Sequence, residues 1–215
     1  FYHVLRAFKD KRYIKVDGKP VFFIYNATDI AELKQFISIW HELAILNGLK
    51  GIHFIGQSRW DKDCKEIFEN GFDAVCRIAI FDAAAKIKGR LINKILTIIR
   101  ERIGVLPLNK FKYSDIISKL SVSDLDEKEN IYPIVIPNFD HTPRSGRKAL
   151  IYTGSTPDLF KKHLKQVFSL ISHKPKEHQI VFLRSWNEWA EGNYVEPDTV
   201  NGHGYLDALK SEILG

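Results

Sequence analysis

The chain has 215 residues, of which 45% are hydrophobic and 27% charged, and its formal net charge is +6. This length and composition suit one folded domain spanning 1–215 and exclude a disordered or collagen-like chain. Because the lysines and arginines are scattered along the whole chain, the positive charge favours solubility over nucleic-acid binding, and we expect no nucleic-acid partner.

The two cysteines, Cys64 and Cys76, are too few for a disulfide framework or a cysteine-based metal site. They indicate reduced thiols and therefore a cytoplasmic protein. No apolar run is long enough to span a bilayer, and no signal-peptide pattern is present. The chain begins at Phe1 and has no methionine, so we expect the natural translation product to extend further toward the N-terminus.

The first half of the chain alternates apolar β-prone runs with helical segments. A strand is predicted at 19–25, followed by a helix over 29–48 with Asp29 as its cap and Gly48 as its stop. A strand at 51–57, a helix at 62–71 and a strand at 72–78 follow. A long basic helical stretch then covers 84–104.

The second half continues the alternation. Strands are predicted at 132–140 and 179–186, and helices at 156–172 and 204–214. Strands that are apolar almost throughout, each followed by an amphipathic helix, are typical of parallel strands that are covered on both faces. The pattern therefore predicts an α/β protein.

Two α/β architectures fit this pattern, an open doubly wound sheet and a (β/α) barrel. No glycine-rich phosphate loop follows any strand, which removes the usual support for a nucleotide-binding open sheet. Polar residues follow nearly every strand, and in a barrel they would all face one rim, where active sites are built. These residues are Asn26, Gln57, Asn138, Asp140, Asn187 and Glu188. We predict a TIM-type barrel that is N-terminally incomplete, with about five of eight βα units.

The stretch SWNEWAEGNYVEPD, 185–198, combines glutamates with two tryptophans. If the strand ends near Trp186 and the chain then turns helically, Glu188 and Glu191 share a face with Cβ atoms about 5 to 6 Å apart. Two carboxyl groups roughly 5 to 9 Å apart are the machinery of glycosidic bond cleavage. Apolar rings such as Trp186 and Trp189 keep one carboxyl of such a pair protonated and suit the faces of sugars. The alternative is a solvated surface turn.

The run WNEWAEGNYVEPD followed by GHGYLDAL resembles the C-terminal signature of the glycoside hydrolase family 99-like proteins, a group also labelled glycosyltransferase WbsX. The segments AFKDKRYIKVDGKPVFFIY, WHELAILNGLKGIHFIGQ, GFDAV and PNFDHTPRSGRKA resemble that family in the same order. The resemblance covers essentially the entire chain. It implies a (β/α)8 barrel, in agreement with the periodicity.

The resemblance also implies roles for individual residues. Family 99 enzymes act within α-mannoside chains with retention, and by the match Glu188 is the base that acts on the sugar's own 2-hydroxyl while Glu191 is the acid. Asn187 would orient a carboxylate or a sugar hydroxyl. Glu196 would bind sugar or support the acid, and its alternative is a solvated loop carboxylate before Pro197.

The stretch NFDHTPRSGR gives two readings of Asp140 and Arg144. In one, both side chains hydrogen-bond sugar hydroxyls at the rim. In the other, Asp140 forms an Asx-type turn and pairs with Arg144. His141 is interpreted as a bystander. Tyr205 is a candidate substrate contact, with packing near the last helix as its alternative.

No cofactor and no metal are expected, because the eight histidines are dispersed and none has a recognisable ligand spacing. The stretch 84–104 combines apolar residues at helical spacing with lysines and arginines. It fits contact with an anionic membrane surface, or a barrel helix with its apolar stripe inward, and the barrel helix is the preferred interpretation.

The sequence thus leads to an enzyme that cleaves or rearranges α-linked glycans, with an oligosaccharide or polysaccharide as its partner. One alternative is a glycosyltransferase of cell-surface polysaccharide biosynthesis, such as that of the O-antigen of lipopolysaccharide. Another is a noncatalytic, glycan-binding partial barrel. A barrel that lacks strands would leave open edges, through which the chain could associate with itself.

Overall fold

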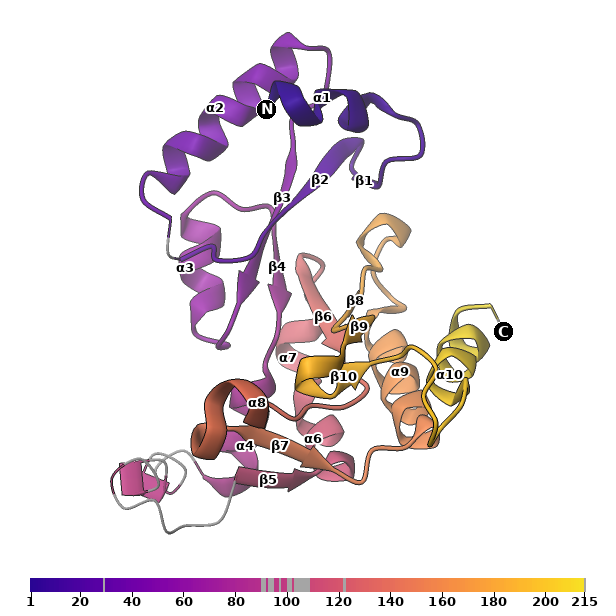
Figure 1. Ribbon diagram of the computed structural model, residues 1–215. Helices are drawn as coiled ribbons and strands as arrows, with labels where there is room; N and C mark the ends of the chain where they lie inside the picture. Colours follow the sequence, from indigo (N-terminus) through magenta and orange to yellow (C-terminus); the bar gives the residue numbers. More distant parts are fainter. Residues whose placement is uncertain are drawn as a thin grey trace. The chain divides into compact units, whose positions relative to one another are not determined.

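The structure is a computed structural model that describes residues 1–28, 30–89, 92, 95, 96, 98, 99, 102, 109–121 and 123–214. The chain divides into two compact units. Unit 1 comprises Phe1–Ala79, Asp124–Pro133 and His173–Ile180, and unit 2 comprises Ile80–Ser123, Ile134–Ser172 and Val181–Gly215. Figure 1 labels their helices and strands.

Unit 1 is built from alternating strands and helices, as predicted. Its elements are α1 (Tyr2–Lys9), β1 (Lys15–Val16), β2 (Lys19–Ile24), α2 (Leu33–Leu46), β3 (His53–Ser58), α3 (Asp63–Glu69), β4 (Ala74–Arg77) and the 3-10 turn η2 (Lys176–His178). β1 and β2 form an antiparallel hairpin, whereas β2, β3 and β4 run parallel. The hairpin and α1 were not predicted.

The end of α2 agrees with the sequence. Gly48 follows the helix with φ +79°, and the Leu49 amide donates to the Ala44 carbonyl at 2.9 Å. This is the left-handed ending that glycine permits without strain. The predicted cap, Asp29, lies outside the described residues, and the position before the helix is occupied by Glu32.

The core of unit 1 packs α1, α2 and α3 against the strands. Its buried side chains include Phe8, Ile37, Phe54 and Ile67. Gly56 lies in the middle of β3, and a Cβ atom there would come within 2.6 Å of the Ile67 side chain. The absence of a side chain at this position therefore lets α3 pack closely on the sheet.

A buried ion-pair network closes the end of β4. The Arg77 side chain, 1% exposed, donates to both carboxylate oxygens of Asp126 at 2.7 and 2.5 Å and to Asp61 at 2.8 Å. Asp126 ends α7 (Ser123–Asp126) and is fully buried. Because each charge is paired and hydrogen-bonded, the cost of burying these ions is offset.

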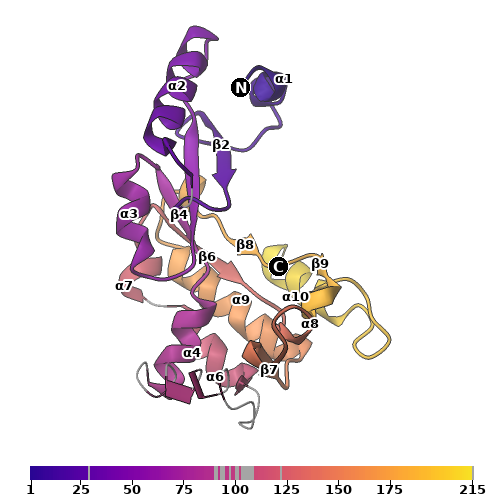
Figure 2. The ribbon, with the colours of Figure 1, turned by 60° about the vertical axis from the view of Figure 1, so that its left-hand side comes forward.

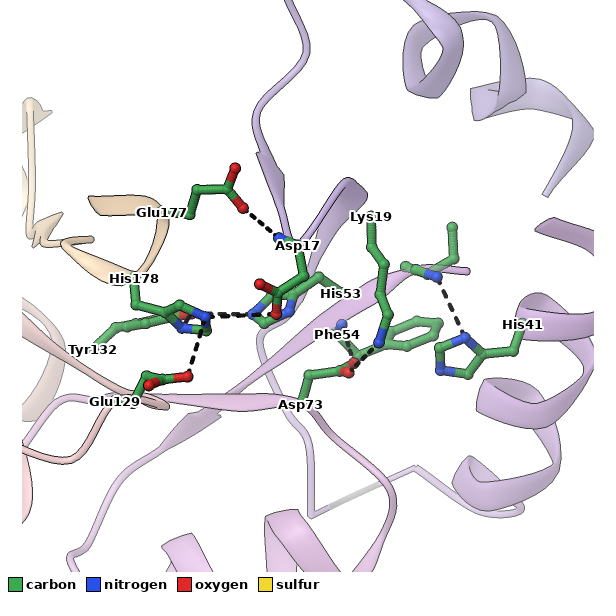
Figure 3. A network of polar contacts seen from close by, with 11 residues as sticks. Asp17, Lys19, His41, His53, Phe54, Asp73, Glu129, Tyr132, Glu177 and His178 are labelled. Atoms are coloured by element: carbon green, nitrogen blue, oxygen red, sulfur yellow. Dashed lines mark hydrogen bonds and ion pairs between the residues drawn. The ribbon is translucent and has the colours of Figure 1, made fainter. Parts of the chain in front are cut away.

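A second polar network lies at the N-terminal ends of the strands (Figure 3). The Tyr132 hydroxyl lies 3.1 Å from His53 Nε2 and 3.0 Å from His178 Nδ1. On its other side, His178 Nε2 faces Asp17 at 3.6 Å and Glu129 at 3.4 Å. Burial lowers the pKa of His53. The network joins the three chain segments of unit 1 at the face that in barrels serves stability.

Unit 2 contains most of the remaining elements. They are α4 (Ile80–Lys88), β5 (Asn109–Lys112), α6 (Tyr113–Leu120), α8 (Thr142–Ser145), η1 (Gly146–Lys148), β7 (Leu150–Thr153), α9 (Pro157–Ile171), β8 (Phe182–Leu183), β9 (Asn187–Glu188), η3 (Trp189–Glu191), β10 (Asn193–Tyr194) and α10 (Gly204–Ile213). β5 and β7 form a separate parallel pair that was not predicted. α9 and α10 lie side by side (Figure 1, Figure 2) over a core that includes Val135, Phe160 and Leu164.

Strand β6 (Ile131–Val135) belongs to both units. Its first three residues pair with β4, and Ile134 and Val135 pair with β8. The hydrogen-bonded order β2, β3, β4, β6, β8 follows the sequence without reversal. Such an order is that of a (β/α) barrel, because a doubly wound sheet reverses its strand order at a switch point. The fold is thus α/β, as predicted.

β8 is much shorter than the strand predicted at 179–186. It ends at Leu183, and one residue further along the Arg184–Ser185 peptide bond is cis. Most of the basic stretch 84–104 beyond α4 lies outside the described residues, so its prediction as a barrel helix or membrane-surface helix stays a prediction. In the part of the chain that the structure describes, no helix is long and apolar enough to cross a bilayer.

Candidate active site in unit 2

The glutamate-rich segment forms a small hairpin closed by a helical turn. Glu188 pairs with Asn193 and Asn187 pairs with Tyr194 across β9 and β10. Between the strands, η3 ends at Glu191 and is followed by Gly192, whose φ of +56° is left-handed. The sequence predicts a strand that ends near Trp186 and a helical turn after it. In the structure the turn begins at Trp189, so Glu188 lies on β9 and Glu191 on the turn that follows.

Two sets of hydrogen bonds fix this hairpin in unit 2. The buried Asn193 side chain accepts from the Ser185 amide at 2.8 Å, and the Asn193 carbonyl accepts from the Ser185 hydroxyl at 2.8 Å. On the other side, the Asp140 amide donates to the Glu191 carbonyl at 2.7 Å. The backbone of Glu191 is thus held against the segment that follows β6.

The carboxylate of Glu191 is buried among cationic groups. Its side chain is only 7% exposed, and Oε1 lies 3.2 Å from Arg144 Nε and 3.5 Å from His141 Nε2, while Oε2 lies 3.7 Å from a terminal nitrogen of Arg184. The sequence suggested tryptophans as the surroundings of the acid. The neighbours are instead charged or chargeable, so burial of this carboxylate is offset by ion pairs.

Arg144 contacts both glutamates. In addition to Glu191, a terminal nitrogen of its guanidinium lies 3.4 Å from Oε2 of Glu188. A guanidinium is a rigid planar fork of donors, so one group fixes the position of one carboxylate relative to the other. Glu188 is the more exposed of the two, with a side chain 36% accessible.

The Asp140 side chain forms hydrogen bonds at the start of the helix that carries Arg144. Its Oδ1 accepts from the Thr142 amide at 2.9 Å and from the Thr142 hydroxyl at 2.6 Å, which is an Asx-type turn. α8 begins at Thr142. The Asx turn is present, but the ion pairs of Arg144 among the described residues go to Glu188 and Glu191.

His141 and Arg184 are functional candidates that sequence reasoning missed. Both lie on the buried ring of Phe139: the His141 ring stacks on it at 5.5 Å and 16°, and the Arg184 guanidinium lies 5.7 Å from its centre. Ser145 Oγ lies 2.9 Å from His141 Nδ1. The sequence offered no spacing signal for this arrangement, since Arg184 comes from a distant segment.

The tryptophans lie on the exposed side of the hairpin. Trp186 is 54% exposed and Trp189 is 49% exposed. The Trp189 ring stacks on Tyr194 with centroids 3.6 Å apart, and its Nε1 donates to Glu196 at 2.6 Å. Glu196 is therefore a partner of Trp189 and not a free loop carboxylate. Accessible aromatic faces next to carboxylates are suited to sugar rings, which present apolar C–H faces and hydroxyls together.

Tyr205 differs from the other candidates because it is buried at the start of α10. Its hydroxyl lies 2.9 Å from Ser155 Oγ, and its ring packs against Phe160. Burial raises the pKa of Tyr205. These contacts are those of a packed residue, and its role as a substrate contact stays a prediction.

Two asparagine side chains near the hairpin each have one buried polar atom without a hydrogen-bond partner in the described part of the chain. These atoms are Oδ1 of Asn138 and Nδ2 of Asn193. A Cβ placed on Gly192 would lie 3.7 Å from the Asn138 side chain, so Asn138 is next to the turn that ends at Glu191. Unsatisfied buried polar groups are costly and often mark places where a ligand or water completes the hydrogen bonding.

The remaining strand-end residues belong to unit 1. Asn26 accepts a hydrogen bond from Arg59 at 3.3 Å, and Gln57 is buried. Cys64 and Cys76 are both buried. Within the described residues, no three histidine, cysteine, aspartate or glutamate side chains are grouped so as to hold a metal ion.

Sequentially ordered parallel strands define a barrel-type protein, and the paired carboxylates with exposed aromatic rings just after the last strand form its candidate active site. The chain belongs to the glycosyltransferase WbsX family, whose profile matches residues 1–209. It is similar to the WxcX proteins of two strains of Xanthomonas campestris pv. campestris, with 26% identity over 98% of this chain. It spans only 29% of the length of these relatives.

Solved structures with a similar fold include the GH99 endo-α-mannosidase of Bacteroides thetaiotaomicron. With BIS-TRIS-propane bound, its TM-score to this chain is 0.55 at 14% identity, covering 98% of this chain and 61% of that one. A second structure of that enzyme gives 0.52 at 15% identity, covering 100% and 62%. This likeness concerns the fold, and with the strand order it supports an incomplete (β/α) barrel.

Proposed function

We propose that this protein cleaves α-linked, α-mannoside-like glycans with retention of configuration, using Glu188 and Glu191. The observation that carries the proposal is the contact of the single guanidinium of Arg144 with both carboxylates. It brings two carboxyl groups into one site, as glycosidic bond cleavage requires. Family membership and the fold of an endo-α-mannosidase support the substrate class.

In the proposed reaction, Glu191 is the acid and Glu188 is the base. Glu188 takes the proton of the sugar's 2-hydroxyl, whose oxygen attacks the anomeric carbon while Glu191 protonates the departing oxygen. Water then opens the small ring at the anomeric carbon, Glu191 takes the water's proton, and Glu188 returns its proton to the 2-oxygen. Both carboxyl groups thus end in their starting states, and two displacements give retention.

The neighbouring residues fit substrate binding. Trp186 and Trp189 offer exposed rings for sugar faces, and Glu196 holds Trp189 through its indole N–H. Asn187 is exposed beside Glu188, which supports the proposal that it binds a hydroxyl. We further propose that residues 1–215 form one domain with about five βα units of an eight-unit barrel.

The test is turnover of α-manno-oligosaccharides by the full-length protein, with the product anomer followed by NMR. Glu191→Gln and Glu188→Gln should each lower kcat by about 10² to 10⁴, the usual contribution of a general acid or base. Glu69→Gln, on the exposed surface of α3, is the matched control. Unchanged turnover in either site variant would falsify the assignment.

A second candidate function is glycosyl transfer in surface polysaccharide assembly, because the matching family is described as glycosyltransferases. Products that appear only with a nucleotide-sugar or lipid-linked donor would favour it over hydrolysis. Glycan binding without turnover, measured by calorimetry, would instead favour a noncatalytic binding protein.

A further inference from the structure

His141 lies between a hydroxyl and the buried carboxylate of Glu191. Its Nδ1 is 2.9 Å from Ser145 Oγ, and its Nε2 is 3.5 Å from Glu191 Oε1. The flat stacking on Phe139 holds the plane of the ring. Three independent contacts thus fix this imidazole, and only one of them involves the proposed acid.

The other groups that face Glu191 have fixed charges. Arg144, on α8, and Arg184, after β8, approach the two oxygens of the carboxylate. A guanidinium stays protonated in proteins and cannot exchange a proton with the acid. Among the described side chains that contact Glu191, His141 is therefore the one that can both donate and accept a proton.

The hydrogen bond to Ser145 determines which nitrogen of His141 is available. When Nδ1–H donates to Ser145 Oγ, Nε2 faces Glu191. Nε2 carries a hydrogen in the imidazolium form and none in the neutral form. Ser145 follows His141 by one helical turn on α8, so the same short helix positions the imidazole and Arg144.

We propose that His141 is a positioning residue for Glu191 and shares one exchangeable proton with it, with Ser145 orienting the imidazole. This inference rests on the proposed function, in which Glu191 is the acid. In the resting pair this proton lies on His141 Nε2 or on Glu191 Oε1. It passes from Nε2 to Glu191 and from Glu191 to the departing oxygen, which leaves a neutral imidazole and a carboxylate. In the second step the water gives a proton to Glu191, and the pair again holds one proton.

The first test compares two substrates in the full-length protein. His141→Gln, which keeps hydrogen-bonding capacity but cannot titrate, should lower kcat on a natural α-linked oligosaccharide by about tenfold to hundredfold, a part of the 10² to 10⁴ of the acid itself. KM should change little. On a glycoside with a dinitrophenolate leaving group, which needs no protonation, kcat should stay within about twofold, and the pH profile of the natural substrate should change shape.

Ser145→Ala should lower kcat on the natural oligosaccharide by less than His141→Gln does, and it should likewise leave kcat on the dinitrophenyl glycoside nearly unchanged. His3→Gln, at an exposed position on α1, should change neither kcat value. An equal loss on both substrates, or an unaltered pH profile, would overturn the proposal, because it would indicate a merely structural role for His141.

The second test does not need turnover. NMR titration of the His141 ring, in the full-length protein and in its Glu191→Gln variant, measures the pairing directly. The midpoint should move to lower pH in the variant, because the anionic partner is lost. Identical midpoints would overturn the inference. If the wild-type protein turns over neither glycoside, the proposed function fails, and the titration still decides whether the pair exists.

Discussion

Arg144 Nε lies 3.2 Å from Oε1 of Glu191, and the Arg144 side chain is more than half exposed while that of Glu191 is buried. The ion pair therefore connects the interior of unit 2 to its surface. Because the same guanidinium reaches Glu188, its geometry controls the arrangement of both proposed catalytic groups.

This geometry predicts that Arg144→Lys impairs turnover more than stability. An ammonium is a point charge and cannot replace the fork that contacts two carboxylates. We expect kcat/KM to fall by about tenfold or more, which is the effect of about 1.4 kcal/mol. The melting temperature should change by only a few degrees, because Arg144 is largely exposed. Arg147→Lys, three residues further along and exposed, is the control, and equal effects of the two variants would contradict the prediction.

The buried pair of Arg77 and Asp126 predicts a large effect on stability. Asp126→Asn leaves the buried guanidinium without its bidentate partner, and such a loss costs about 3 to 5 kcal/mol of unfolding free energy. Urea unfolding measures this cost.

The double variant Arg77→Met with Asp126→Leu removes both charges at once. It should recover most of the lost stability, because the buried guanidinium and its fully buried partner are both removed, while the remaining carboxylate of Asp61 is partly exposed to water. A double variant as unstable as Asp126→Asn would show that shape, and not charge, dominates this site.

His163 predicts a dependence of stability on pH. It is fully buried in α9, both ring nitrogens are without a hydrogen-bond partner in the described part of the chain, and burial lowers its pKa to about 3. The folded pKa lies below the unfolded value of about 6.5, so the unfolded chain binds more protons between these values. Stability therefore falls as pH decreases below about 6.5, by about 1.4 kcal/mol per unit.

His163→Leu should abolish this dependence. Its advantage over the wild type in unfolding free energy should grow steadily from pH 7 to pH 5, as measured by urea titration at each pH. His3→Leu, at an exposed position on α1, should leave the slope unchanged. Parallel slopes for His163→Leu and the wild type would show that His163 is not buried in the neutral form.

Gly56 predicts a steric effect in unit 1. Gly56→Ala places a methyl group 2.6 Å from Ile67 and 3.0 Å from Phe72, closer than real contacts allow, and overpacking of this kind costs about 1 to 3 kcal/mol. Gly56→Ala combined with Ile67→Val should be less unstable than the sum of the two single changes, because valine returns some of the space. Strict additivity would count against the steric explanation.

The sequence predicts the regular elements of this fold well where periodicity is strong. The strands near 19–25, 51–57 and 72–78 and the helices near 156–172 and 204–214 are all present with small shifts of boundary. α1 and the β5 and β7 pair were missed. They are short, and their stability comes from tertiary packing, which a single sequence does not reveal.

Sequence reasoning proposed the two glutamates of the candidate site but not their surroundings, and their catalytic role stays a prediction. A turn close to Glu188 and Glu191 follows from local spacing. Their contact with Arg144 does not, because it depends on how α8 approaches β9 from more than forty residues away. His141 was interpreted as a bystander for the same reason.

The hydroxyl of Tyr132 carries a single hydrogen between two imidazoles. If His178 Nδ1 accepts that hydrogen, His53 has to donate from Nε2 for the second contact to be a hydrogen bond. If His53 accepts it, His178 has to donate from Nδ1. The tautomers of the two rings are therefore coupled. If His178 gains a proton, its Nδ1 donates to the Tyr132 hydroxyl, and His53, at the start of β3, has to accept the hydroxyl hydrogen at Nε2.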